Sequence, residues 1–87
     1  MSACPMQNFN GVTSEVWSCL VAQAAQYGVV INTPQGTASK SGFTFTWNYN
    51  ASSQTVAIQC TDSPTLVPCA VIDSKIQSIA TGCGATG

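Results

Sequence analysis

The feature that most restricts how this chain can fold is a stretch of strict alternation near its middle. From residue 43 to residue 49, aromatic side chains alternate with short polar ones in the order Phe-Thr-Phe-Thr-Trp-Asn-Tyr. Residues 54–60 alternate again, and residues 48–53 between the two runs are turn formers. A period of two residues is typical of a strand with one buried face. The pattern therefore predicts a β-hairpin whose apolar face pairs aromatic with β-branched side chains.

Two segments with helical periodicity flank this hairpin. The first can be capped by Thr13 or Ser14 and ends at Gly28. The second follows the proline-bearing segment 61–68 and ends at the glycines 82 and 84. Each has one apolar face at about 100° per residue. The faces comprise Val16, Trp17, Leu20, Val21, Ala24 and Tyr27 in the first segment, and Cys69, Ile72, Ile76, Ile79 and Cys83 in the second.

The remaining segments complete the expected architecture. Residues 29–31 are a β-branched run that predicts a short buried strand, and residues 35–42 are small and polar, which is typical of a linker. Residues 1–11 form an extended arm, residues 12–84 a single domain and residues 85–87 a tail. The order helix, strand, β-hairpin, helix predicts an α+β two-layer sandwich, with a small antiparallel-type sheet covered on one face by two helices.

Charged side chains are scarce, which excludes several classes of function. The 87 residues contain two lysines, Lys40 and Lys75, three acids, Glu15, Asp62 and Asp73, and no arginine or histidine. Two lysines 35 positions apart cannot neutralise a run of phosphates, so we expect no nucleic-acid binding. The apolar runs are too short to cross a bilayer, so we expect no membrane insertion.

The same composition lacks the usual catalytic groups. Without histidine the chain has no Ser-His or Cys-His pair and no imidazole metal ligand. It has no Cys-x-x-Cys motif of the kind found in zinc sites and thioredoxin-like proteins. The acids are explained by helix capping or by solvation. We therefore expect no catalytic residue, no metal and no cofactor.

Five cysteines in so short a chain favour an oxidising compartment, either extracellular or at the cell surface. Our first choice of disulfide is Cys60 with Cys69, our second is Cys4 with Cys19, and Cys83 remains as the free thiol. The alternative is that all five are reduced and buried. Residues 1–12 lack the basic and apolar stretches of a secretory signal, so a signal would already have been removed.

Two features of the hairpin are candidate surface sites. Asn50-Ala51-Ser52 matches the N-glycosylation acceptor, although turn chemistry alone also explains it. The polar face of the hairpin is uncharged and could bind carbohydrate or a second copy of the chain. The candidate residues of this face are Thr44, Thr46, Asn48, Thr55 and Gln59. The aromatic face is expected to be core, with a stacking platform for a sugar as the alternative.

Together these observations predict a small, non-enzymatic, secreted or surface module for binding or assembly. It would act through its uncharged polar sheet face, a sheet edge or its loops, with a protein partner or self-association first and carbohydrate second. One alternative is a disulfide-held inhibitor or toxin that uses the loop at residues 35–41 or 62–68. Another is a redox protein that depends on a cysteine thiolate.

Overall fold

The predicted hairpin forms the centre of a four-stranded antiparallel sheet. In the computed structural model, which describes residues 3–87, strand β3 (Phe43–Asn50) pairs with strand β4 (Thr55–Asp62) across a turn at residues 51–54. Trp47 lies opposite Ile58, and Tyr49 lies opposite Val56. The aromatic and β-branched side chains thus share one face of the sheet, which confirms the hairpin.

The outer strands differ from the expectation. The strand order is β1-β4-β3-β2, with β1 (Gln7–Phe9) and β2 (Gln35–Lys40) at the two edges. Strand β1 lies within the predicted arm, whose first two residues are outside the described part of the chain. Strand β2 occupies the predicted linker, so the prediction of a loop at residues 35–42 was wrong over most of its length.

Small side chains explain why β2 does not look like a strand in the sequence. The register places Gly36 opposite Trp47 and Ala38 opposite Phe45. A Cβ atom on Gly36 would lie only 2.7 Å from Cζ2 of the Trp47 indole. The rings of Trp47 and Phe45 therefore leave room only for small residues on the inner face of β2, and β-branched residues are not favoured there.

The predicted strand at residues 29–31 is absent, because this segment closes the first helix. Helix α1 (Ser14–Gln26) is capped by Thr13, whose Oγ1 accepts a hydrogen bond from Val16 N–H. At its other end Gly28 takes a positive φ of 83°, and Val29 N–H donates to the carbonyl of Ala24. This is the Schellman pattern, in which the residue after the glycine still belongs to the helix end.

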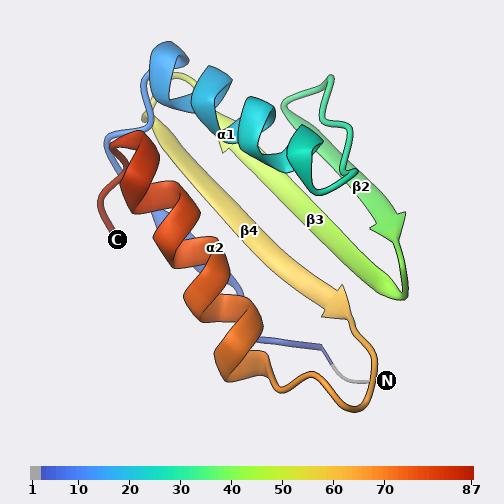
Figure 1. Ribbon diagram of the computed structural model, residues 1–87. Coiled ribbons are helices and arrows are strands. Elements are labelled where there is room, and N and C mark those ends of the chain that lie inside the picture. The colour runs from blue at the N-terminus through green and yellow to red at the C-terminus, as the bar shows by residue number, and fades with distance from the viewer. Residues whose placement is uncertain (1–2) are drawn as a thin grey trace.

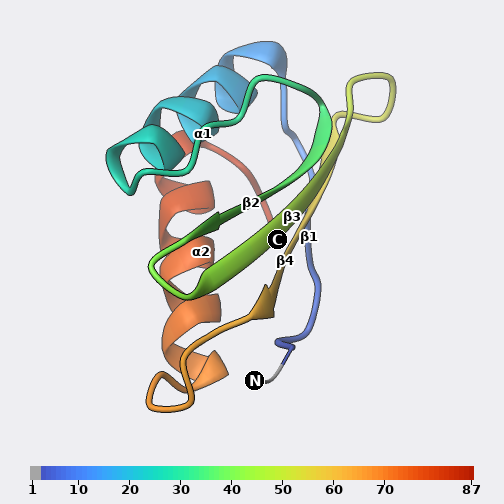
Figure 2. The same cartoon turned by 90° about the vertical axis from the view of Figure 1, so that its right-hand side faces the viewer.

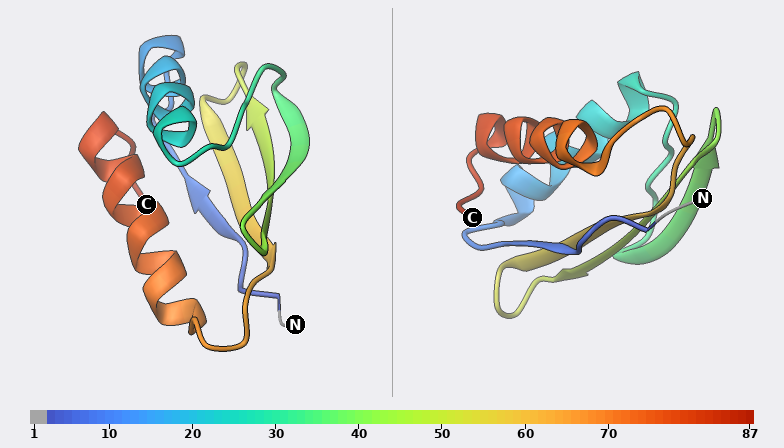
Figure 3. Two further views of the ribbon diagram at one scale, coloured as in Figure 1. Left: turned by 45° about the vertical axis from the view of Figure 1, so that its right-hand side comes forward. Right: turned by 90° about the horizontal axis from the view of Figure 1, so that it is seen from below.

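Both helices cover the same face of the sheet, as the two-layer prediction required. Helix α2 (Cys69–Cys83) ends at Gly84 in the left-handed conformation. Seen from below, α1 and α2 form one layer and the strands the other (Figures 1 and 3). Seen edge-on, the sheet has no helix on its opposite face (Figure 2). Within residues 3–87, neither helix combines the length and the apolar character needed to cross a membrane.

The core contains two clusters of buried residues, and Ile76 packs against both. The larger is built around Phe9, Val12 and Val56, all nearly inaccessible to solvent. The predicted tail contributes to it, because Ala85 is buried and Thr86 pairs with Asn10. The smaller contains the following buried residues: Cys4, Cys60 and Ile72.

Both predicted disulfides were wrong, and so was the prediction of Cys83 as the free thiol, although the structure does have two bridges and one free thiol. Cys4 is bonded to Cys69, and Cys19 to Cys83, whereas Cys60 is unpaired and buried; all five lie in the described residues. The expected partners were neighbours along the chain, but the observed ones are 65 and 64 positions apart. They meet because α2 packs back against α1 and the amino-terminal segment. Two disulfides are consistent with an extracellular location.

Candidate functional site

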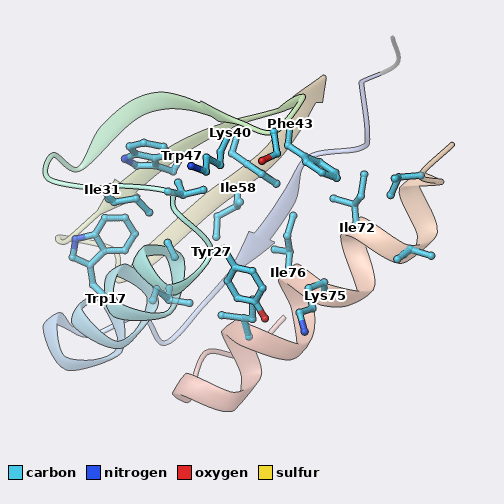
Figure 4. Close-up of a pocket in the computed structure, with 18 residues that line it drawn as sticks. Trp17, Tyr27, Ile31, Lys40, Phe43, Trp47, Ile58, Ile72, Lys75 and Ile76 are labelled. Carbon is cyan, nitrogen blue, oxygen red and sulfur yellow. The ribbon is translucent and has the colours of Figure 1, made fainter. Parts of the chain in front are cut away.

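An apolar cavity of about 380 Å³ lies between the sheet and the two helices. Aromatic side chains of β3 form its floor, and both helices form its walls (Figure 4). Trp17, Ile31 and Trp47 gather at one end of the cavity in this view, and Phe43 and Ile72 at the other. The lining is mainly aliphatic and aromatic. Its remaining apolar members include Leu20, Ala24, Tyr27, Val29, Phe45, Ile58, Val67, Val71, Ile76 and Ile79.

The aromatic floor is held in place by hydrogen bonds at its polar tips. The indole N–H of Trp47 donates to the carbonyl of Thr33 at 2.9 Å. The hydroxyl of Tyr49 donates to the carbonyl of Val12 at 2.9 Å, and its ring stacks on Trp17 with centroids 4.6 Å apart. Because the indole N–H of Trp47 is bonded outside the lining, its ring presents apolar surface to the cavity. Tyr49 is not part of the lining, but it stacks on Trp17, which is.

The disulfides fix the walls of the cavity. The Cys19–Cys83 bridge ties α1 to the end of α2, and the Cys4–Cys69 bridge ties the start of α2 to the amino-terminal segment. Helix α2 is thus anchored at both ends. The two bridges restrict the movement of α2 relative to α1 and to the amino-terminal segment.

Both lysines of the chain lie at this cavity. Lys40 is the last residue of the edge strand β2, Lys75 is on α2, and both are exposed members of the lining. None of the three acidic residues lines it, although all three lie in the described part of the chain. A chain with a formal charge of −1 therefore has a local concentration of positive charge at an apolar cavity.

The carboxyl-terminal end of α1 positions the two lysines. The ammonium of Lys75 lies 5.4 Å from the centroid of the Tyr27 ring, a cation–π distance. The stem of Lys40 runs past Gly28, where an added Cβ would approach Lys40 Cε to 2.9 Å. Helix carbonyl ends attract cations, and α1 has no basic residue in its own last turn. The stem of Lys40 and the ammonium of Lys75 thus both lie close to the chain at residues 27–28.

The predicted polar face lies on the other side of the sheet. Thr46 is opposite Thr37 on β2 and Gln59 on β4, which gives an uncharged polar row across three strands. Several of its groups are already used within the protein. The Gln59 amide donates to the Cys4 carbonyl, and the hydroxyls of Thr44 and Thr55 bond to those of Ser39 and Ser53. Thr46 and Asn48 are the remaining predicted members of this face.

Asn50 ends β3 and serves the hairpin turn. Its Oδ1 accepts hydrogen bonds from the backbone N–H groups of Ser52 and Ser53 at 3.0 and 3.3 Å. This arrangement is the turn chemistry that the sequence offered as the alternative to glycosylation. The side chain is exposed, so a glycan at Asn50 stays a prediction.

The free thiol of Cys60 is shielded from solvent. It lies in the smaller core cluster, and its S–H donates to the carbonyl of Asp62 at 3.1 Å. Burial raises the pKa of the Cys60 thiol, and the charges of Asp73 and Asp62 raise it further, against the opposing effect of hydrogen bonds from the backbone. The thiolate is therefore disfavoured at neutral pH.

The sequence did not indicate the cavity or the role of the lysines. Alternation showed that Phe45 and Trp47 face the helices, but it contains no information about how far the helices stand from the sheet. Lys40 was assigned to a loop, and Lys75 is 35 positions away along the chain. One signal was present, since Ala24 interrupts the larger side chains on the apolar face of α1 and leaves room there.

Comparison of the chain with protein-family models, with curated proteins and with solved structures finds no match. No relative therefore indicates a ligand or a reaction. Function has to be inferred from the cavity, its charges and the exposed sheet face.

Proposed function

We propose that this protein is a small, secreted, non-enzymatic binding module that holds a small apolar molecule in the cavity between its two layers. The cavity itself carries the proposal. Ligand sites are typically concave, mostly apolar spaces of about 300–1,000 Å³ with a few polar groups that fix orientation. The 380 Å³ space, its apolar lining and the two lysines fit that description. These features support a ligand site on the helix side of the sheet.

The packing of the domain supports a ligand rather than an empty space. A domain of this size has a small core, and unfilled apolar volume lowers its stability because the lining loses contacts. Here the core is split into two clusters with the cavity lining between the layers. A bound apolar molecule would restore those contacts and release water from the walls.

The surface beside the cavity supports an entry route. Tyr27 is 50% exposed and Val71 58% exposed, and both belong to the lining. Apolar side chains thus continue from the interior to solvent at this place. A small apolar molecule could enter here without separation of the sheet from the helices.

Binding of the uncharged fluorophore N-phenyl-1-naphthylamine tests the proposal. We expect enhanced fluorescence with saturable, one-to-one binding. Ala24→Phe places a ring in the cavity and should abolish binding, whereas Ala22→Phe puts the same ring at an exposed site on α1 outside the lining and should not. Circular dichroism checks the fold of both variants.

If Ala24→Phe does not fold, Val71→Trp at the exposed rim provides the second obstruction. Absence of binding to the wild-type protein would contradict the proposal. Equal binding by wild type and a folded obstructed variant would contradict it as well, because the fluorophore would then lie elsewhere.

The uncharged polar face is a second candidate site, favoured by the row of Thr37, Thr46 and Gln59 next to the edge strand β2. Hydroxyl and amide groups in such a row suit carbohydrate or a second copy of the chain. Sedimentation equilibrium and a glycan-binding screen test it, with Thr46→Lys as the disrupting variant. A monomer that binds no glycan would contradict this second candidate.

A further inference from the structure

We infer that the ligand is a single-chain anionic amphiphile, an alkyl carboxylate, with its tail in the cavity and its head group at Lys40 and Lys75. This inference rests on the proposed function and names the class of ligand for the same site. It follows from three observations: the sign of the charges at the cavity, the position of the two amines, and the volume of the cavity.

The sign of the charges favours an anion. Both cations of the chain belong to the lining and none of its acids does. A cation in the ligand would meet two like charges, while a neutral apolar ligand would leave the lysines without a function in binding. A carboxylate is attracted to both amines and accepts hydrogen bonds from them.

The position of the amines places the head group at the edge of the cavity. Lys75 lies over the ring of Tyr27, and Lys40 passes Gly28. Both lysines are exposed, so their charges remain hydrated and the carboxylate would not have to be buried. The flexible stems allow either ammonium to move toward a head group beside Tyr27. The tail would then extend along the apolar floor toward Trp47.

The volume favours a slender tail. At about 380 Å³ the cavity is near the lower end of the range for ligand sites, which is enough for one unbranched chain. Each methylene group buried in it should raise the affinity about fourfold until the cavity is full. Affinity should then stop rising with chain length.

A competition experiment tests the inference. Decanoate, decanol and decyltrimethylammonium have the same alkyl chain and different head groups, and each is used to displace N-phenyl-1-naphthylamine. We expect decanoate to bind about tenfold more tightly than decanol, since each of the two exposed ion pairs contributes up to about fivefold. Decyltrimethylammonium should bind most weakly, and added salt should reduce the preference for decanoate.

Substitution of the lysines tests whether Lys40 and Lys75 cause the preference for decanoate over decanol. Lys40→Met with Lys75→Met keeps most of the aliphatic stems and should lower decanoate affinity about tenfold, with decanol affinity changed less than about twofold. Each of these substitutions changes the net charge by −1. The double variant therefore changes it by −2. Gln35→Glu with Gln77→Glu makes the same total change at exposed positions outside the lining, and it should leave both affinities unchanged.

The outcomes separate this inference from the proposed function. If decanol and decanoate bind equally and the double lysine variant affects neither, the cavity binds apolar molecules but the anionic head group is wrong. The lysines then serve only the carboxyl-terminal end of α1. If the fluorophore and all three amphiphiles fail to bind, the proposed function is itself wrong and the inference falls with it.

Discussion

The ammonium of Lys75 lies 5.4 Å from the centroid of the Tyr27 ring, so a cation of α2 contacts the aromatic residue that ends α1. This contact joins the two helices at the cavity. It also holds one of only two cations beside the half-exposed ring. We therefore expect Tyr27 to contribute both to the stability of the protein and to the proposed binding of a ligand.

Substitution of Tyr27 should separate those two roles. Tyr27→Leu removes the cation–π contact and should lower the free energy of unfolding by about 0.5–1 kcal/mol, as expected for an exposed pair. Tyr27→Phe keeps a ring at the same place and should change it much less. Urea unfolding measures both. Equal destabilisation by the two substitutions would mean that the hydroxyl, not the ring face, matters here.

Gly36 should tolerate no side chain, because the Trp47 indole occupies the space where a Cβ would lie. Gly36→Ala is expected to destabilise the protein by about 1–3 kcal/mol through overpacking. Gly82 on α2 is the matched control, since nothing lies within 4 Å of its Cβ position. Gly82→Ala should stabilise by up to about 1 kcal/mol through helix propensity. Thermal unfolding compares the two, and a neutral Gly36→Ala would show that the indole can move.

A tryptic digest without reduction tests the disulfides directly. Cleavage after Lys40 and Lys75 gives three fragments, at residues 1–40, 41–75 and 76–87. The bridges Cys4–Cys69 and Cys19–Cys83 join all three, so mass spectrometry should find one linked species. The pairing expected from the sequence would instead release three separate fragments, and that result would contradict the fold around α2.

The thiol of Cys60 should make stability fall as pH rises. The pKa of this thiol is raised in the folded protein. As pH rises above the ordinary thiol pKa of about 8.5, Cys60 therefore loses its proton in the unfolded chain before it does so in the folded protein. This deprotonation stabilises the unfolded state relative to the folded one. The free energy of unfolding should therefore decrease from about pH 8.5 upward, with a limiting slope of about 1.4 kcal/mol per pH unit. Cys60→Ala should lack this component.

Reaction of the native protein with a disulfide reagent provides a second measurement of the same thiol. Cys60 should react slowly until the protein unfolds, when one thiol per chain becomes available. A fast reaction in the native state, or parallel stability profiles for wild type and Cys60→Ala, would contradict the burial of this group.

The sequence predicted β3 and α1 correctly, because the apolar residues of each recur with the period of a strand or a helix. Phe43 to Tyr49 alternate because one face of β3 is buried, and the face of α1 from Trp17 to Tyr27 follows from its contact with the same layer. Strand β2 escaped this reasoning, since Gly36 and Ala38 are determined by the rings of Trp47 and Phe45 across the sheet. Contacts between strands override local propensity at such positions.

The candidate site depends on distances that no local pattern encodes. The cysteine partners are more than 60 positions apart, and the assumption that near neighbours pair gave the wrong bridges. Lys40 and Lys75 line the same cavity only because the β2–β3 end of the sheet and the middle of α2 both face it. The composition argues against functions that need many charges, but it does not show that both lysines line one cavity.

The most direct test of the ligand cavity is an NMR measurement of contacts between decanoate and the protein. We predict intermolecular nuclear Overhauser effects from the methyl end of decanoate to the indole protons of Trp47 and to the methyl groups of Ile31, both members of the lining at the end away from Lys75. Contacts that appear instead at Thr46 and Asn48 on the opposite sheet face, or no contacts at a saturating concentration, would contradict the account.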